Sequence, residues 1–299
     1  MKLLPSLKQL EYLVALADTL HFGRASENCN ITPSTLSAGI RDLESVLGVS
    51  LAERTKRHVL MTSIGNEIVA RARCLLRDAE DVMQLAASNR EPLTGDMRLG
   101  VIPTISPFLL PRVLPPLNRR YPALRLYIRE EQTAPLLTRL RSGEIDVALI
   151  ALPYDIEGLV SKVLFEDEFE FACSKDHPLA TKKVVRLGAL ADQPLMLLEE
   201  GHCLRGHALA ACQIAGGPAR AQFEASSLHT LVQMVAAGIG VTLLPKLAIR
   251  SQITRGSNIK LVPLSAAPSR QIGLVWRQSA LRIQEFEILG DALSGSAKG

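Results

Sequence analysis

Residues 21–65 read HFGRASENCNITPSTLSAGIRDLESVLGVSLAERTKRHVLMTSIG, and this stretch decides the fold of the N-terminal part of the chain. The pattern predicts a short helix over 22–28 and a turn after it. Thr32 then fits a helix N-cap and Pro33 the first helical position, so the next helix is expected to run to Gly48. Two helices joined by a tight turn are typical of a helix-turn-helix, although an ordinary three-helix core would give the same pattern.

The sequence around these two helices predicts further parts of the same module. An amphipathic helix precedes them, and the residues of its apolar face are Leu7, Leu10, Tyr12, Leu13, Leu16 and Ala17. After them, LAERTKRHVLMTSIG predicts two strands joined by a basic turn, a wing suited to phosphate or minor-groove contact. The basic residues of the wing are Arg54, Lys56, Arg57 and His58. The expected recognition helix exposes Ser34, Thr35, Ser37 and Arg41.

An apolar stripe continues through a long predicted helix over 63–88. Its members recur at spacings of three and four: Ile64, Ile68, Ala72, Leu75, Leu76, Ala79, Val82, Met83 and Ala86. Such a stripe between domains indicates that the helix pairs with another helix. Paired subunits would place two recognition helices on successive half-sites of a pseudo-palindrome.

Beyond a hinge at 90–95, strands and helices alternate. Strands are expected over 97–102, 124–129 and 147–151, and helices over 107–121 and 134–142. This βαβαβ order predicts a parallel sheet covered by helices. Strands near 162–174 and 272–276 would cross to a second, similar lobe. The fold class is therefore α/β with an N-terminal all-α winged helix-turn-helix and a two-lobed effector domain like a periplasmic binding protein.

These patterns set the expected boundaries. The DNA-binding module would occupy 1–62, a dimerisation helix 63–90 and a regulatory domain 91–299, with lobe I over about 95–166 and 272–299 and lobe II over about 167–271. In open α/β sheets, ligands bind beyond the carboxyl ends of strands. Thr104 and Thr133 follow the first two strands, so both hydroxyls are candidates for the cleft, although each also fits a plain helix cap.

A second stretch, GHCLRGHALAAC at 201–212, holds two cysteines nine residues apart. Cys203 is expected at a helix start beside His202 and Arg205, and both features favour a thiolate. Nine helical residues rise about 13 Å and turn about 900°, which leaves Cys203 and Cys212 on opposite faces. A disulfide between them would need at least partial unwinding, as a redox switch requires.

Two other interpretations of this stretch stay open. Free cysteines are often buried as small hydrophobic groups, as we expect for Cys29, Cys74 and Cys173. A metal site formed by His202, Cys203, His207 and Cys212 is a weaker alternative, because these spacings do not match the usual zinc motifs.

Composition limits the class of protein. With 299 residues the chain is long enough for two or three compact units, and 47% hydrophobic residues fit a soluble protein. The net charge of +4 permits nucleic-acid binding without requiring it. No apolar run long enough to span a membrane occurs, and the N-terminus does not resemble a signal peptide. Five cysteines without a secretory signal indicate a cytoplasmic protein with no structural disulfides.

The 21–65 stretch resembles the winged helix-turn-helix of LysR-type transcriptional regulators. By that resemblance Thr32, Pro33, Ser34, Thr35, Ser37 and Arg41 would face DNA, and Arg54 would meet the DNA backbone. One departure is present: this chain has Thr32-Pro33 where the family often has Ser-Gln, so a base contact from that glutamine is missing.

The regulatory half resembles the hydrogen-peroxide-sensing branch of the same family. The similar segments are GVIPTISPFLLP, EEQTAPLLTRLRSGEID, LLEEGHCLRGHALAAC, MVAAGIGVTLLP and RQIGLVWR. The resemblance implies that Cys203 reacts with peroxide and that Cys212 resolves the product into a disulfide. It also implies that Thr104, Thr133, His202 and Arg270 hold peroxide or stabilise the thiolate.

The expected function is therefore peroxide-dependent control of antioxidant genes, with no cofactor and no enzymatic turnover. Expected partners are double-stranded DNA, further copies of the chain as a dimer or tetramer, RNA polymerase, and hydrogen peroxide as the signal. Two alternatives are a metabolite-responsive regulator with inert cysteines and a thiol peroxidase. A small molecule that alters DNA binding would indicate the first alternative, and sustained turnover with a reductant the second.

Overall fold

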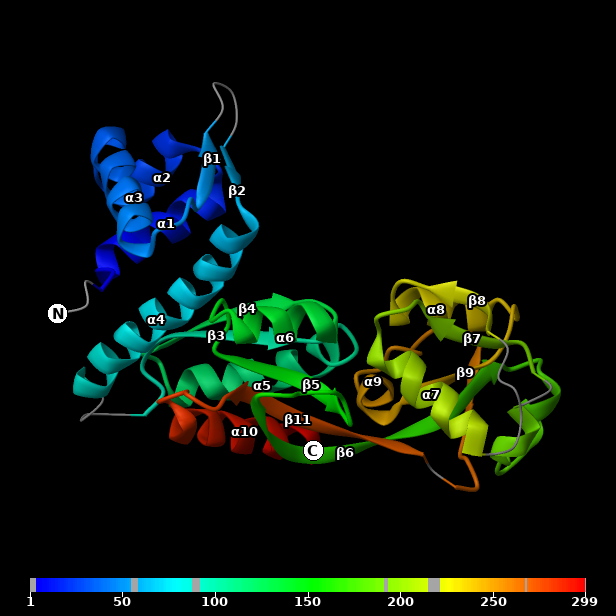
Figure 1. Cartoon of the computed structure of the whole chain (residues 1–299). Coiled ribbons are helices and arrows are strands. Elements are labelled where there is room, and N and C mark those ends of the chain that lie inside the picture. Colours follow the sequence, from blue (N-terminus) through cyan, green and yellow to red (C-terminus); the bar gives the residue numbers. More distant parts are fainter. Residues whose placement is uncertain are drawn as a thin grey trace. The chain divides into compact units, whose positions relative to one another are not determined.

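The computed structural model describes residues 4–54, 59–87, 92–190, 193–214, 221–266 and 268–298. The chain divides into two compact units. The first comprises Met1–Glu91, Arg139–Glu144 and Ser279–Arg282, and the second comprises Pro92–Thr138, Ile145–Gln278 and Ile283–Gly299. Together they confirm the predicted fold class, an N-terminal helix-turn-helix followed by an α/β regulatory region (Figure 1).

The first unit contains the predicted winged helix-turn-helix. Its elements are α1 (Leu7–Thr19), α2 (Phe22–Asn28), α3 (Pro33–Leu47), β1 (Ala52–Arg54), β2 (Val59–Met61) and α4 (Ser63–Ala87). Strands β1 and β2 pair antiparallel as the wing. Residues 55–58 at its tip, which include Lys56, Arg57 and His58, lie outside the described residues.

Local capping explains where these helices begin and end. Ser6 forms a capping box with Gln9 at the start of α1. At α3, the Thr32 hydroxyl accepts a hydrogen bond from the backbone N–H of Thr35, and Pro33 occupies the first turn as predicted. Gly48 ends α3 with φ at +71°, a left-handed conformation that favours glycine.

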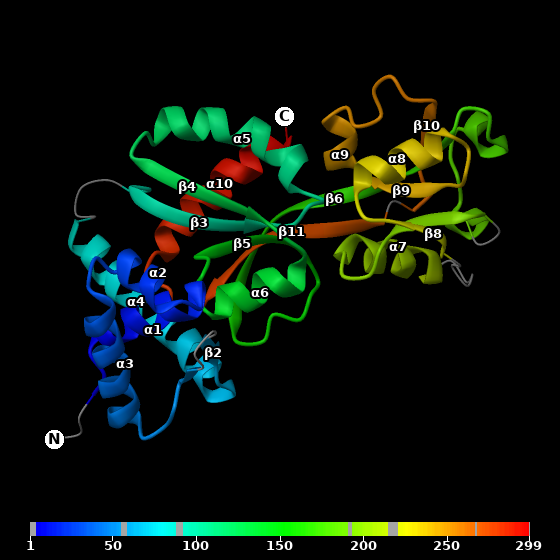
Figure 2. The same cartoon turned by 90° about the horizontal axis from the view of Figure 1, so that it is seen from above.

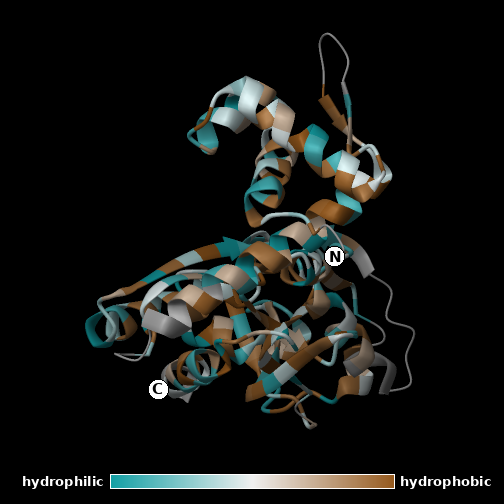
Figure 3. Cartoon of the chain, turned by 60° about the vertical axis from the view of Figure 1, so that its left-hand side comes forward, coloured by the Kyte–Doolittle hydropathy of each residue, from teal (hydrophilic) through white to brown (hydrophobic). Residues whose placement is uncertain are grey.

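The core of this unit gathers the apolar faces of α1, α3 and the inner side of α4. Leu13, Leu16, Leu36 and Ile40 are fully buried, and Ala72 of α4 packs against the same cluster. Figure 3 shows hydrophobic and hydrophilic residues alternating along the helices, as expected for helices that bury one face. The apolar stripe of α4 is thus partly used within its own chain.

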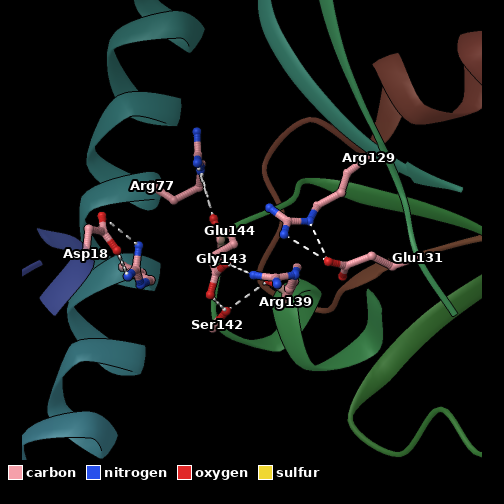
Figure 4. Close-up of polar contacts among 9 residues, drawn as sticks. Asp18, Arg77, Arg129, Glu131, Arg139, Ser142, Gly143 and Glu144 are labelled. Carbon is pink, nitrogen blue, oxygen red and sulfur yellow. Dashed lines mark hydrogen bonds and ion pairs between the residues drawn. The ribbon is translucent and has the colours of Figure 1, made fainter. Parts of the chain in front are cut away.

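The segment Arg139–Glu144 belongs to the first unit and is fixed by polar contacts. Arg139 forms an ion pair with Glu144, and the Ser142 hydroxyl donates to both of these residues. From α4, the Arg77 guanidinium donates to the carbonyl of Gly143 at 3.2 Å and 3.3 Å (Figure 4). The Cys74 thiol also donates to the carbonyl of Arg141 at 3.0 Å, so Cys74 has a polar partner rather than a purely apolar one.

The second unit is built on a seven-stranded sheet with the order β10-β6-β11-β5-β3-β4, in which β9 also pairs with β6. Its first strands are β3 (Gly95–Val101), β4 (Leu124–Glu130) and β5 (Val147–Leu152), with α5 (Ser106–Arg120) and α6 (Thr133–Arg141) between them. β3 is parallel to both β4 and β5. This is the predicted βαβαβ unit, with α5 and α10 (Ile283–Lys298) on one face of the sheet and α6 on the other (Figure 2).

Two long antiparallel strands continue out of this part. They are β6 (Leu159–Ser174) and β11 (Ser269–Arg277), and β11 pairs with the first part of β6, from Leu159 to Glu168. The distal half of β6 pairs with β9 (Thr242–Pro245) and β10 (Ile259–Val262). Around it lie β7 (Leu195–Leu198), α7 (Cys203–Ile214), β8 (Ala221–Ala225), α8 (Leu228–Ala236) and α9 (Lys246–Arg250). β6 therefore pairs with strands in both parts of the sheet (Figure 1).

Candidate functional site

Helix α7 starts at Cys203, as the sequence predicted. The Cys203 thiol is free and half-buried. It lines a pocket of about 610 Å³ whose other walls include His202, His207 and Tyr154. As the first residue of α7, Cys203 lies at the positive end of the helix dipole.

Cys212 belongs to the same uninterrupted helix, although its side chain lies outside the described part of the structure. Nine helical positions separate the two residues, a rise of about 13 Å with a rotation that leaves them on opposite faces. A disulfide requires Cα atoms within about 7 Å. Joining Cys203 to Cys212 would therefore require α7 to unwind.

His202 is buried directly before Cys203. Burial lowers the pKa of His202, while Glu199 and a backbone hydrogen bond with Ser226 oppose that effect. The Nε2 atom of His202 lies 3.9 Å from a carboxylate oxygen of Glu199. With its pKa below the ordinary value, His202 is neutral rather than cationic at neutral pH.

Arg270 is fully buried and joins β11 to β6 and to the turn between β3 and α5. It lies directly opposite Asp167 in the pairing of β11 with β6, and its Nε and Nη2 atoms donate to the Asp167 carboxylate at 3.1 Å and 3.0 Å. Its Nη1 and Nη2 atoms donate to the hydroxyl and the carbonyl of Thr104 at 2.8 Å and 3.0 Å. The other Asp167 oxygen accepts from the Leu247 backbone at 2.9 Å. Thr104 and Arg270, both predicted site residues, are thus in direct contact.

The interpretation of Thr104 and Thr133 as plain helix caps is wrong for both. Thr104 lies in the turn before α5, whose N-cap is Ile105, and its hydroxyl accepts from Arg270. Thr133 is the first residue of α6, and its buried Oγ1 has no hydrogen-bond partner in the described part of the chain. A buried hydroxyl without a partner is unfavourable, so Thr133 is a candidate to hydrogen-bond a small polar ligand.

The start of α7 lies against the start of α6. Gly201 has φ at +94°, and a Cβ atom added to it would lie 2.3 Å from the side-chain oxygen of Gln132. Only glycine avoids both the strained backbone and this collision. Gly201 therefore brings the residues before Cys203 next to Gln132 and Thr133.

His207, which the sequence offered only as part of a metal site, lines the Cys203 pocket one helical turn later. Its Nδ1 atom is buried and has no hydrogen-bond partner among the described residues. Burial lowers the pKa of His207, and the positive charge of Arg270 lowers it further. The charge of Arg270 thus influences the wall of the pocket that contains Cys203.

The predicted site residues fall into two groups. Cys203 and His202 line the pocket, while Thr104 and Arg270 form a buried polar cluster outside its lining. Sequence reasoning missed Asp167, the partner of Arg270. It also counted Arg205 as a cation near the thiol; Arg205 lines the same pocket as Cys203, and its charge is paired with Glu224.

The alternative metal site finds no support in the described residues. No group of three or more His, Cys, Asp or Glu side chains among them is arranged to hold a metal ion. Cys29 and Cys173 agree with the packing interpretation, because burial raises the pKa of each thiol.

The residues predicted to face DNA gather at the start of α3. Thr32, Pro33, Ser34, Thr35 and Arg41 are exposed, and Ser37 is half-buried. The hydroxyls of Ser34 and Thr35 each lie 2.8 Å from that of Thr32. Arg54 ends β1, and its side chain lies outside the described residues.

Comparison with known proteins places these two units in one family. Residues 7–66 match the bacterial regulatory helix-turn-helix protein of the lysR family, and residues 90–296 match the LysR substrate binding domain. The chain belongs to the LysR family. The sequence resemblance to LysR-type regulators is thereby confirmed.

Individual members of the LysR family are similar over nearly the whole chain. The transcriptional regulator EstR of Acinetobacter baylyi is 43% identical, and the alignment covers 98% of this chain and 97% of EstR. The hydrogen peroxide-inducible genes activator of Pectobacterium carotovorum is 40% identical, with 98% and 97% covered. A full-length OxyR variant of Pseudomonas aeruginosa is 38% identical, with a TM-score of 0.82 and 96% and 94% of the two chains covered.

These LysR-family relatives are named for gene regulation rather than for an enzymatic reaction. Among the described residues, no helix is long and apolar enough to cross a membrane.

Proposed function

We propose that this LysR-family regulator senses hydrogen peroxide through a reversible Cys203–Cys212 thiol/disulfide switch and thereby controls antioxidant genes. The observation that carries the proposal is the placement of Cys203 as the first residue of α7, facing a pocket, with Cys212 in the same helix but out of reach. Reaction at the first cysteine can therefore be converted into a structural change only by unwinding α7.

The chemistry proceeds in two balanced steps. The Cys203 sulfur attacks one peroxide oxygen, the O–O bond breaks, and the second oxygen leaves as water after gaining a proton, so sulfur is oxidised to sulfenic acid. The Cys212 thiol then displaces water from that sulfenic acid and forms the disulfide. In this proposal Thr104, Thr133, His202 and Arg270 hold peroxide or stabilise the thiolate.

Peptide mass spectrometry under non-reducing conditions tests the switch. After brief exposure to dilute peroxide, we expect a peptide that joins Cys203 to Cys212 and loss of both free thiols. The Cys212→Ser variant should stop at a sulfenic acid on Cys203 that dimedone traps. The Cys29→Ser variant is the matched control, because Cys29 is also a half-buried free thiol. Unchanged thiols at both switch positions in the unaltered chain would exclude the proposal.

The DNA-binding part of the proposal concerns the start of α3. We infer that Thr32, Pro33, Ser34, Thr35, Ser37 and Arg41 face an operator and that Arg54 contacts its backbone. In this proposal α3 enters the major groove, and the wing formed by β1 and β2 lies along the phosphates. A footprint that changes after oxidation would link this surface to the switch.

We also propose that copies of the chain pair through α4. Val69 and Ala72 of α4 are buried in the chain's own core, whereas Leu75, Val82 and Met83 are 52%, 59% and 76% exposed. Exposed apolar residues along a long helix are suited to a second helix. We further propose that dimers assemble into tetramers. The protein would act in the cytoplasm and contact RNA polymerase at promoters.

A metabolite-responsive regulator with inert cysteines is the second candidate. Two observations favour it: EstR, at 43% identity, is not named for peroxide, and the pocket of about 610 Å³ is large for peroxide alone. The footprint on DNA distinguishes the metabolite-responsive regulator from the peroxide sensor. For a metabolite-responsive regulator, a small metabolite would change DNA binding even in a Cys203→Ser variant. Peroxide would have no effect on the unaltered chain.

A further inference from the structure

The Nδ1 atom of His207 is a buried ring nitrogen that makes no hydrogen bond to the described residues. The ring lines the pocket that contains Cys203. His207 follows Cys203 by four residues in α7, a spacing that puts two side chains on the same helix face about 5–6 Å apart at Cβ. His207 is therefore on the same side of the helix as the thiol, although no hydrogen bond joins its Nδ1 to the sulfur in this structure.

The other histidine beside the thiol is already engaged. His202 has a backbone hydrogen bond with Ser226, and its Nε2 lies 3.9 Å from a Glu199 oxygen. One ring nitrogen of His202 is therefore occupied by a backbone partner. Of the two pocket histidines, His207 has a buried nitrogen without a partner among the described residues.

Charged groups around His207 favour its neutral form. Arg270 of β11 acts on it from one side, and burial acts in the same direction, so the pKa of His207 lies below its ordinary value. The Arg270 charge is itself partly balanced by Asp167 of β6. On its own helix, Arg205 is paired with Glu224 of β8.

The remaining titratable groups in the pocket wall are Tyr154, from the loop after β5, and Glu200, from the segment before α7. Neither changes the conclusion that a neutral imidazole is available at neutral pH. A neutral imidazole beside a thiol is the usual arrangement of a general base that activates a sulfur nucleophile, and the hydrogen bond between the two groups often forms only when the substrate binds.

We propose that His207 transfers the proton in the reaction of Cys203 with hydrogen peroxide, an inference that rests on the proposed function. Nδ1 takes the proton from the Cys203 thiol. The thiolate then attacks one peroxide oxygen, the S–O bond forms and the O–O bond breaks, and the leaving oxygen takes the proton from Nδ1 as it becomes water. The ring ends neutral, sulfur has lost two electrons, and peroxide has gained them.

The pH dependence of sulfenic acid formation tests this step. All proteins carry Cys212→Ser so that the reaction stops at the sulfenic acid, which dimedone traps and mass spectrometry quantifies. The rate with hydrogen peroxide is measured from pH 5 to 9.5, beside the alkylation rate of Cys203 with iodoacetamide. Alkylation reports the thiolate alone, because iodide leaves without a proton.

With His207 present, the peroxide rate should pass through a maximum and fall at high pH, where no proton remains on the ring for the leaving oxygen. His207→Gln should react at least about tenfold more slowly at pH 7 and should rise to a plateau without that fall. The alkylation rate should rise to a plateau in both proteins, which also shows that the pocket is intact. His229→Gln, an exposed histidine outside the pocket lining, is the matched control and should keep the maximum.

Two results overturn the inference in different ways. If His207→Gln keeps both the peroxide rate and the fall at high pH, His207 does not transfer the proton, while the proposed function stands. If Cys203 is alkylated but forms no sulfenic acid even with His207 present, the proposed function fails and the proton transfer fails with it.

Discussion

Arg270 and Asp167 face each other across β11 and β6, and both side chains are almost completely removed from water. Each has satisfied partners besides the other, since Arg270 also donates to Thr104 and Asp167 accepts from the Leu247 backbone. A buried charge is tolerated only with such compensation. This pair therefore fixes Thr104, a candidate peroxide ligand, to the strands that run through the whole regulatory unit.

Removing Arg270 should destabilise the protein strongly. We expect Arg270→Met to lower the free energy of unfolding of the regulatory region by about 3–5 kcal/mol, because Asp167 is left buried without its cation. Urea unfolding followed by circular dichroism measures the loss. The double variant Arg270→Met/Asp167→Leu should lose clearly less than the sum of the two single variants. Additive losses would show that the two residues do not act as a pair.

Stability should fall as the pH drops below 6.5. The pKa values of His202 and His207 in the folded protein are lowered from 6.5, so in the window below 6.5 the unfolded chain binds more protons than the folded one. The free energy of unfolding is therefore highest above pH 6.5 and decreases as the pH falls through the lowered pKa values. The His202→Gln/His207→Gln variant should show a shallower decrease between pH 6.5 and 5 in urea unfolding. An identical slope in both proteins would exclude these two histidines as the cause.

Gly206 should make α7 easier to unwind. It lies inside the helix, and a Cβ atom added to it would meet nothing within 4 Å. Alanine there should stabilise the helix by about 1 kcal/mol and so slow formation of the Cys203–Cys212 disulfide about fivefold, without slowing sulfenic acid formation. Rapid-quench mass spectrometry separates the two steps. Gly295→Ala in α10 is the matched control, since its surroundings are equally open. Equal disulfide rates would show that helix opening does not limit the reaction.

Arg41 should contribute directly to operator binding. Arg41→Ala should weaken binding to the operator by roughly 1–3 kcal/mol, because an exposed arginine of the recognition helix loses its contact with a base or a phosphate. Fluorescence anisotropy at fixed salt concentration gives the Kd. Arg119→Ala, an exposed arginine of α5 in the other unit, should leave the Kd unchanged. If the Arg41→Ala and Arg119→Ala variants bind the operator with equal Kd, Arg41 of α3 does not contribute to the proposed interface.

If copies of the chain pair through α4, a charged residue in the apolar face of this helix should lower the molecular mass measured in solution. Val82→Lys should dissociate dimers, because it places a charge in an apolar seam. Multi-angle light scattering reads the mass directly. Val184→Lys changes an equally exposed valine in the regulatory unit and should keep the dimer. A dimer that survives Val82→Lys would mean that the seam lies elsewhere.

Most of the fold followed from local pattern. The cap at Thr32, the proline after it and the period of the apolar residues predicted α3 to within a residue, because these signals act over a single helical turn. Strand and helix alternation gave the parallel sheet in the same way. The predicted boundaries of lobes and linker stay predictions, since β6 pairs with strands in both parts of the sheet.

The candidate site was harder to predict because its contacts join distant segments. Asp167 had a visible signal: it shares the inward alternation of β6 with the buried Phe169 and Phe171, which is unusual for a carboxylate and calls for a cation. Nothing local pointed to Arg270 as that cation, 103 residues later in the chain. The threonines were expected as possible caps because capping is the commonest use of such hydroxyls, and only the assembled sheet shows otherwise.

The unbroken helix between Cys203 and Cys212 also affects how long the oxidised intermediate lasts. If oxidation proceeds as proposed, the sulfenic acid persists for as long as α7 takes to open. Small thiols in the cell can reverse the oxidation during that interval. A short pulse of oxidant would then be erased before the disulfide forms, whereas lasting exposure would be recorded. The twelve residues of α7 would act as a delay that lets the regulator ignore brief fluctuations.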